Sequence, residues 1–203
     1  MIKNIIFDFG DIFINLDKEA TFKALFDLGV TQVSEETMKV YQHYEMGLLS
    51  TTEFLAFFEE KFKIPSQQLI KAWNAILLDF PIHRFQFIQE LSNNSKYRLF
   101  LLSNTNDLHI SWIQQDWGML HYQDFKNCFE HFYLSHEMKM RKPNVNIFEY
   151  VLEAHDLVPQ ETLFVDDTKE NTEAASLLGI QVWNLIPGKD DVTQLFDLKY
   201  FSY

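Results

Sequence analysis

The amino-acid sequence predicts an α/β protein with a doubly wound, mostly parallel sheet and a small group of helices inserted after the first strand. Two patterns support this prediction. From residue 97 onward, short apolar runs alternate with segments of helical periodicity, which is typical of a parallel sheet covered by helices on both faces. Before that point, several helical segments follow one another, too many for the single crossover that joins two parallel strands.

The first strand and the inserted helices account for the N-terminal part of the chain. The apolar run IKNIIF at residues 2–7 indicates a short buried strand. Helical patterns follow it, with glycine stops at Gly29 and Gly47 and a capping box formed by Ser50 and Glu53. These patterns cover four segments, 18–29, 34–47, 50–62 and 65–80.

The domain boundaries follow from these segments. We expect a helical subdomain at residues 16–80, inserted into a core domain made of residues 1–15 and 81–203. In the core, a helix at 81–92 leads back to the sheet. The remaining strands are expected at 97–104, 131–137, 162–167 and 180–185, and the remaining helices at 107–118, 144–157 and 170–179.

Composition and charge exclude several classes of function. The formal net charge of −12 argues against binding to nucleic acid or to an anionic membrane surface, because both need a basic footprint. No apolar run reaches the ~18 residues of a membrane span, and residues 1–9 do not have the pattern of a signal peptide. The single Cys128 fits a reducing compartment, so we expect a cytoplasmic protein.

Acidic side chains follow two of the predicted strands. Asp8 comes directly after IIF, where a carboxylate can act as a nucleophile, although it can also simply cap a turn. Asp166 and Asp167 end another apolar run, and adjacent like charges there favour a bound Mg²⁺, although one of them can instead cap the next helix. Because ligands of such folds bind beyond the carboxyl ends of the strands, we expect these acids to meet.

A hydroxyl group and a cation complete this set. Ser103 and Asn104 follow the strand LFLL, and a hydroxyl with backbone N–H groups near a helix N-terminus can bind an anion. Lys142, between Arg141 and Pro143, can neutralise a carboxylate and a phosphoryl oxygen. Each signal alone is weak, since strand–Ser–helix junctions and basic turns are common. Their joint occurrence in this order is more specific.

The order of these segments resembles the haloacid dehalogenase-like (HAD) hydrolase superfamily from Ile2 to about Leu185. The resemblance implies a Rossmann-like core, a small helical cap of the C1 type at residues 16–80, and Mg²⁺ as cofactor. YEMGLLSTTEF and RKPNVNIFEYVLE are also similar to stretches of bacterial sugar-phosphatase-like members. The implied reaction is hydrolysis of a small phosphorylated metabolite through an aspartyl phosphate.

The resemblance also implies a role for each matching residue. Asp8 is the expected nucleophile and Lys142 its catalytic partner. Ser103, Asn104 through its backbone N–H, and Lys142 are expected to bind the phosphoryl group. The expected metal site consists of Asp8, the Gly10 carbonyl and Asp167, with Asp166 acting either directly or through its neighbours.

One departure from the family pattern leaves alternatives open. Most HAD phosphatases carry a second Asp two residues after the nucleophile, as the general acid and base, and here Gly10 stands in that place. A protein that binds a phosphorylated ligand or a protein partner without catalysis is therefore one alternative. A 2-haloacid dehalogenase is another, but it needs a cation for the substrate carboxylate. None of the three arginines, Arg84, Arg98 and Arg141, falls within the inserted helices.

Overall fold

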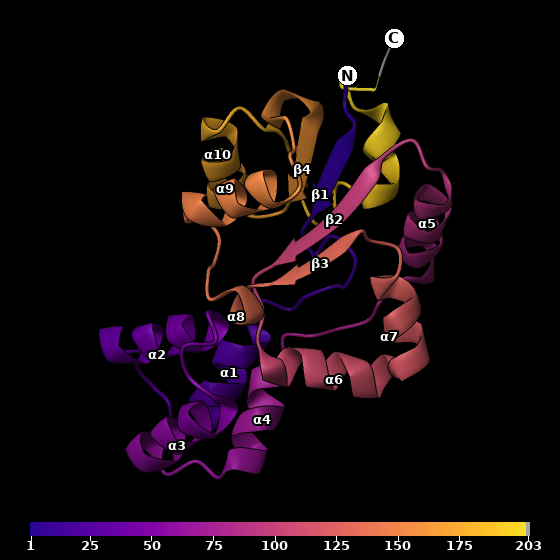
Figure 1. The fold of residues 1–203 in the computed structure, drawn as a ribbon. Coiled ribbons are helices and arrows are strands. Elements are labelled where there is room, and N and C mark those ends of the chain that lie inside the picture. The colour runs from indigo at the N-terminus through magenta and orange to yellow at the C-terminus, as the bar shows by residue number, and fades with distance from the viewer. Residues whose placement is uncertain (202–203) are drawn as a thin grey trace.

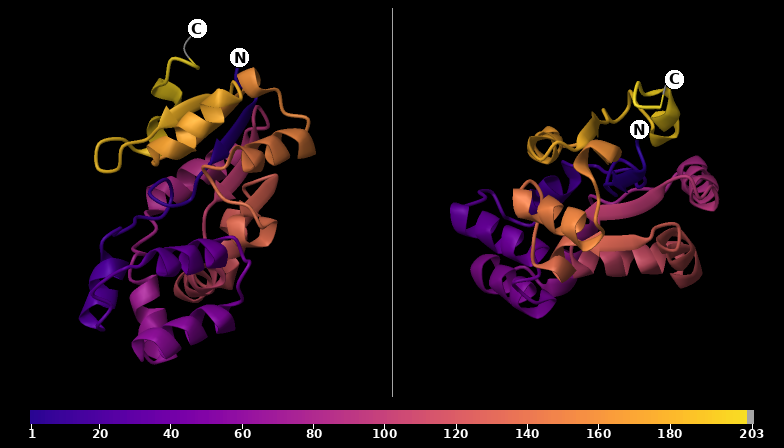
Figure 2. Two further views of the ribbon diagram at one scale, coloured as in Figure 1. Left: turned by 90° about the vertical axis from the view of Figure 1, so that its left-hand side faces the viewer. Right: turned by 45° about the horizontal axis from the view of Figure 1, so that its top comes forward.

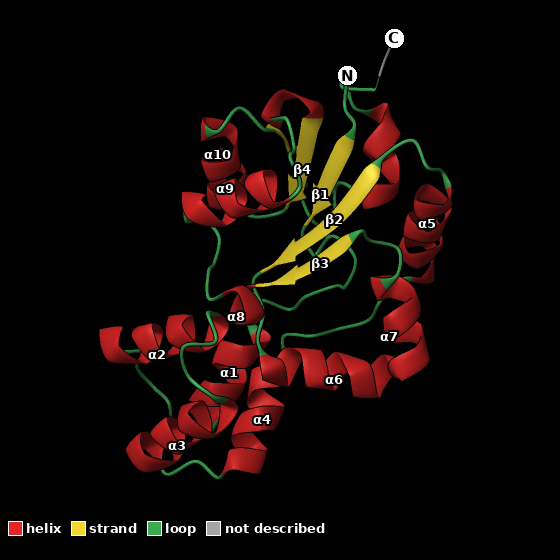
Figure 3. Cartoon of the chain, viewed as in Figure 1, coloured by secondary structure: helices red, strands yellow, loops and turns green. Residues whose placement is uncertain are grey.

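The computed structural model describes residues 1–201 and contains a five-stranded sheet in which all strands are parallel (Figures 1 and 3). The strand order is β3-β2-β1-β4-β5, which the sequence did not determine. The strands are β1 (Asn4–Phe7), β2 (Arg98–Ser103), β3 (His131–Leu134), β4 (Thr162–Asp166) and β5 (Gln181–Asn184). The predicted doubly wound, parallel α/β fold is confirmed.

The sheet separates two apolar cores because neighbouring side chains of a strand point to opposite faces. In β1, Ile5 and Phe7 belong to one core and Ile6 to the other. The first core is covered by α5 (Ile82–Asn93), α6 (Asp107–Trp117), α7 (Met119–Lys126) and the 3₁₀-helix η2 (Val192–Asp197). The second core is covered by α9 (Val145–Ala154) and α10 (Lys169–Leu177).

Four helices between β1 and α5 form a separate group, named here the helical insert (residues 20–74). They are α1 (Ala20–Asp27), α2 (Glu35–Glu45), α3 (Thr51–Phe62) and α4 (Ser66–Asn74). The insert has its own apolar core, which includes Phe54, Phe58 and Trp73. It lies beyond the carboxyl ends of the strands, on the side away from both chain termini (Figures 1 and 2).

Local details agree with the sequence in some places and differ in others. The predicted capping box of Ser50 and Glu53 starts α3. The expected strand at 131–137 is shorter, because Ser135 already begins the short helix α8 (Ser135–Met138). Helix α7 and the 3₁₀-helices η1 (Pro159–Glu161) and η2 were not predicted. No helix in residues 1–201 has the length and apolarity needed to cross a membrane.

Candidate active site

Three strand ends bring the predicted residues together. Phe7 of β1 pairs with Leu101 of β2 and Val165 of β4, so Asp8, Ser103 and Asp166 follow at the same edge of the sheet. Between this edge and the helical insert lies a pocket of about 430 Å³. Its lining includes six of the seven predicted site residues: Asp8, Gly10, Ser103, Asn104, Lys142 and Asp167. Asp166 is the exception, since it is fully buried behind the pocket wall.

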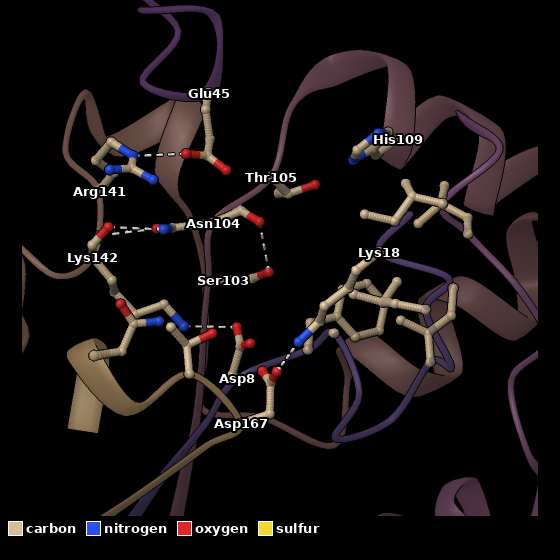
Figure 4. Close-up of a pocket in the computed structure, with 18 of the residues that line it drawn as sticks. Asp8, Lys18, Glu45, Ser103, Asn104, Thr105, His109, Arg141, Lys142 and Asp167 are labelled. Atoms are coloured by element: carbon tan, nitrogen blue, oxygen red, sulfur yellow. Dashed lines mark hydrogen bonds and ion pairs between the residues drawn. The ribbon is translucent and has the colours of Figure 1, made fainter. Parts of the chain in front are cut away.

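Lys142 is the buried cation of the site. Its Nζ donates a hydrogen bond to Asp8 Oδ1 at 2.7 Å (Figure 4). It donates two more, to Asp166 Oδ2 at 2.6 Å and to the Leu102 carbonyl at 2.7 Å. Burial alone would lower the pKa of the Lys142 ammonium, but the Asp166 and Asp8 carboxylates outweigh burial and raise it. Lys142 therefore stays charged and fixes one oxygen of Asp8.

Asp166 supports the site from behind. Besides Lys142, its carboxylate accepts hydrogen bonds from the Thr168 backbone N–H at 2.7 Å and from Asn171 Nδ2 at 3.0 and 3.1 Å. Both oxygens of Asp166 are therefore engaged by the protein. The adjacent Asp167, in contrast, reaches the pocket.

The pKa of Asp8 is raised to about 7. Burial is the main cause, and the nearby Asp166 and Asp167 carboxylates add to it, while Lys142 opposes it. No donor among residues 1–201 is hydrogen bonded to Asp8 Oδ2, so this oxygen is available to a ligand. The excess of negative charge favours a bound cation.

The donor set at this point fits a hard divalent cation. Ligand oxygens of Asp8, Asp166 and Asp167 lie within 4.8 Å of one another. Gly10 also lines the pocket, and its carbonyl accepts no hydrogen bond from the described part of the chain. Carboxylate and carbonyl oxygens are the ligands that Mg²⁺ prefers.

Ser103 and Asn104 offer donors to an anion. The Ser103 hydroxyl is only weakly engaged, at 3.5 Å from the Asn104 carbonyl, and the Asn104 backbone N–H has no acceptor within residues 1–201. The Asn104 side chain is occupied, because it exchanges two hydrogen bonds of 2.9 Å with the Lys142 backbone. Helix α6 begins only at Asp107, so these two residues precede the helix by a short loop.

The sequence did not reveal several other pocket residues. Lys18 forms ion pairs with Asp167 and with Asp11, at 3.1 Å from Asp11 Oδ2. On another wall, Arg141 Nε donates to Glu45 Oε2 of the insert at 2.7 Å (Figure 4). Lys18 belongs to none of the four site segments, and no sequence pattern indicates that Glu45 pairs with a residue 96 positions away.

His109 also lines the pocket, and its environment keeps it neutral. Its Nε2 lies 3.2 Å from the Trp73 carbonyl, so this nitrogen carries the proton. Burial lowers the pKa of His109 to about 4. His136, which is close to Lys142 in the sequence, has its Nε2 3.3 Å from Asp107 Oδ1 and does not line the pocket.

Comparisons with known proteins agree with this geometry. D-ribitol-5-phosphate phosphatase of Bacteroides thetaiotaomicron is 27% identical over 197 residues, which cover 94% of this chain and 95% of that protein. A solved HAD family enzyme from Bacteroides thetaiotaomicron, in complex with magnesium, is 34% identical with a TM-score of 0.85, covering 97% of this chain and 99% of that chain. The wild-type complex of that enzyme with magnesium and inorganic phosphate gives 33% identity and a TM-score of 0.79, over 94% and 97% of the two chains.

The family itself is identified over most of the chain. Residues 5–185, which include all seven predicted site residues, match the model of haloacid dehalogenase-like hydrolases. The resemblance read from the four sequence segments is thereby confirmed. The chain belongs to the haloacid dehalogenase-like hydrolase family.

Proposed function

We propose that the protein is a magnesium-dependent hydrolase of a small phosphomonoester and that Asp8 is its nucleophile. The observation that carries the proposal is the buried Lys142 ammonium, which holds one oxygen of Asp8 and leaves the other facing the pocket. Attack of Asp8 on phosphorus forms an aspartyl phosphate, which water then hydrolyses.

The phosphoryl group binds to donors that the protein leaves unused. The Ser103 hydroxyl donates only one long hydrogen bond within the described chain, the Asn104 backbone N–H has no acceptor there, and Lys142 adds positive charge beside them. Both groups lie at the end of β2, and Asp8 follows the neighbouring strand β1, which supports binding of the phosphoryl oxygens next to the nucleophile. Charge-assisted hydrogen bonds of this kind are roughly twice as strong as neutral ones.

The metal site supplies the remaining positive charge. Asp8, Asp167 and the Gly10 carbonyl would hold Mg²⁺, which neutralises phosphoryl oxygens. Asp166 acts through its neighbours, because its own oxygens are engaged by Lys142, Asn171 and the Thr168 backbone N–H. Magnesium in the solved relative supports this assignment.

The size of the pocket and the known relative guide the choice of substrates. A pocket of about 430 Å³ suits a small metabolite, and the helical insert would serve as the cap over it. Since the curated relative is named for D-ribitol 5-phosphate, sugar and polyol phosphates are the first class to test. The cytoplasmic location inferred from the single cysteine stays a prediction.

Phosphate release from a panel of phosphorylated metabolites, with and without Mg²⁺, tests the proposal. Asp8→Asn should abolish turnover, whereas the matched control Asp116→Asn, an exposed acid of α6, should not change it. Full activity in Asp8→Asn would exclude the mechanism. A folded wild-type protein that binds phosphate but releases none from any ester would favour the non-catalytic alternative.

A further inference from the structure

The alcohol that leaves a bound phosphate ester needs a hydrogen-bond donor. In an in-line displacement by Asp8, the bond to the alcohol oxygen breaks on the side of phosphorus opposite the nucleophile. Negative charge develops on that oxygen, and a positioned donor lowers the barrier. Under the proposed function, that oxygen faces the helical insert, so the donor has to come from this side of the pocket.

Most polar groups of the pocket already interact with other groups of the protein. Gly10 has no side chain, and a Cβ built on it would lie 2.6 Å from Leu16 Cδ1, so Leu16 fills the space a longer residue would need. The ring N–H of His109 is already donated to the Trp73 carbonyl. Lys142 already makes three hydrogen bonds, and Arg141 is paired with Glu45.

Lys18 is suitably positioned for this role and has an N–H donor that no other residue of the described chain uses. It lies in the segment between the core and α1, and its ammonium points into the pocket toward Asp167, next to Asp8 (Figure 4). Its side chain is half exposed, with two ion pairs at its end, to Asp167 and Asp11. Lysine carries three N–H donors, so one remains for a ligand.

The Asp11 carboxylate holds the Lys18 ammonium in position. Its Oδ1 accepts a hydrogen bond of 3.0 Å from the Leu16 backbone N–H, and its Oδ2 lies 3.1 Å from Lys18 Nζ. The residue is buried and has a positive φ of 55°, so the turn itself orients the carboxylate. When a metal ion occupies Asp167, Asp11 still retains the ammonium.

We propose that Lys18 is a catalytic residue that donates a hydrogen bond to the leaving oxygen of the ester, with Asp11 as its positioning residue. This proposal rests on the proposed phosphatase function. The bond from an Asp8 oxygen to phosphorus forms while the bond from phosphorus to the alcohol oxygen breaks, and the electron pair stays on that oxygen. The alcohol takes its proton from water, and the resulting hydroxide is neutralised when a second water hydrolyses the aspartyl phosphate.

The test compares two esters with different leaving groups at saturating Mg²⁺. Glycerol 2-phosphate releases a strongly basic alkoxide, whereas p-nitrophenyl phosphate releases a weakly basic phenolate that needs little help. Lys18→Met should lower kcat/KM for glycerol 2-phosphate about 10–100-fold and change that for p-nitrophenyl phosphate less than about threefold. Lys18→Arg should restore part of the loss, and Asp11→Asn should show the same substrate dependence in kcat more weakly.

Controls separate this role from the others that Lys18 could have. Lys23→Met removes an exposed charge from the same region and should leave both substrates unaffected. Equal losses on both substrates, or a change only in the Mg²⁺ dissociation constant measured by calorimetry, would overturn the proposal for Lys18 while leaving the phosphatase intact. A wild-type protein that releases phosphate from neither of these esters nor from any ester of the metabolite panel would overturn the proposed function as well.

Discussion

Replacing the buried Lys142 by methionine should destabilise the protein strongly. Methionine fills a similar volume but removes all three hydrogen bonds of the ammonium, to Asp8, to Asp166 and to the Leu102 carbonyl. Two buried carboxylates then lose their cation. Breaking a buried ion pair in this way costs roughly 3–5 kcal/mol. We expect a loss of this size in the free energy of unfolding at pH 7.5 without metal.

The pH dependence of this loss gives a second and sharper test. Without Lys142, which opposes the rise, the pKa of Asp8 is raised further, so the folded variant binds more protons than the unfolded chain above about pH 4. The stability of Lys142→Met therefore falls as the pH rises, and its deficit against the wild type should be smaller at pH 5 than at pH 7.5.

Urea unfolding in EDTA at the two pH values measures the effect. The control is Lys169→Met, which removes an exposed ion pair with Glu173 and should cost less than about 1 kcal/mol. A deficit below about 1 kcal/mol for Lys142→Met at pH 7.5, or one that does not change with pH, would refute the assignment of Lys142 as the charge that balances both acids.

Three further predictions concern stability. In EDTA at pH 8, Asp8→Asn should be more stable than the wild type by about 1–3 kcal/mol in urea unfolding, because burial raises the pKa of Asp8 to about 7 and its charge is unfavourable without metal; the gain should vanish at pH 5. Asp191→Ala should cost about 1–2 kcal/mol, since Asp191 caps η2 and pairs with Arg84. Partial burial alone would raise the pKa of Asp191, but its hydrogen bonds hold it well below the usual value, so this contribution is present above about pH 4 and is lost below it. Gly47→Ala should cost at least about 2 kcal/mol in thermal unfolding, because Gly47 has φ +62° and its Cβ would lie 2.0 Å from the His136 carbonyl oxygen; a variant as stable as the wild type would contradict this packing.

The sequence located those site residues whose position depends on strand ends. Asp8, Ser103 and Asp167 could be placed in one pocket because parallel strands of an open sheet end at a common edge. Lys18 could not be found in this way. It lies in an irregular segment, and its partner Asp167 is 149 residues away, so only the folded chain brings the two together.

Secondary structure was predictable where the hydrophobic periodicity extended over many residues. It was predicted incorrectly where a single residue ended an element. The sequence predicted a helix end at Gly118, which is correct, but the positive φ of 80° at this residue interrupts the helical backbone for only one residue before α7 begins. Ser135 ends β3 because its hydroxyl donates to the Glu45 carbonyl at 2.6 Å and also accepts from the Thr105 N–H. Such contacts depend on tertiary structure and leave no local pattern.

The central position of β1 has a consequence for folding during synthesis. Asn4 pairs with Arg98 on one side and with Thr162 on the other, so β1, which is synthesised before β2 and β4, waits for both neighbours. Until β4 is made, the backbone of the apolar segment Asn4–Phe7 has at least one open edge, and open apolar edges promote aggregation. The nascent chain therefore exposes an edge of β1 until β4 is made, while the helical insert, whose apolar core consists mainly of its own residues, can form before the sheet is complete.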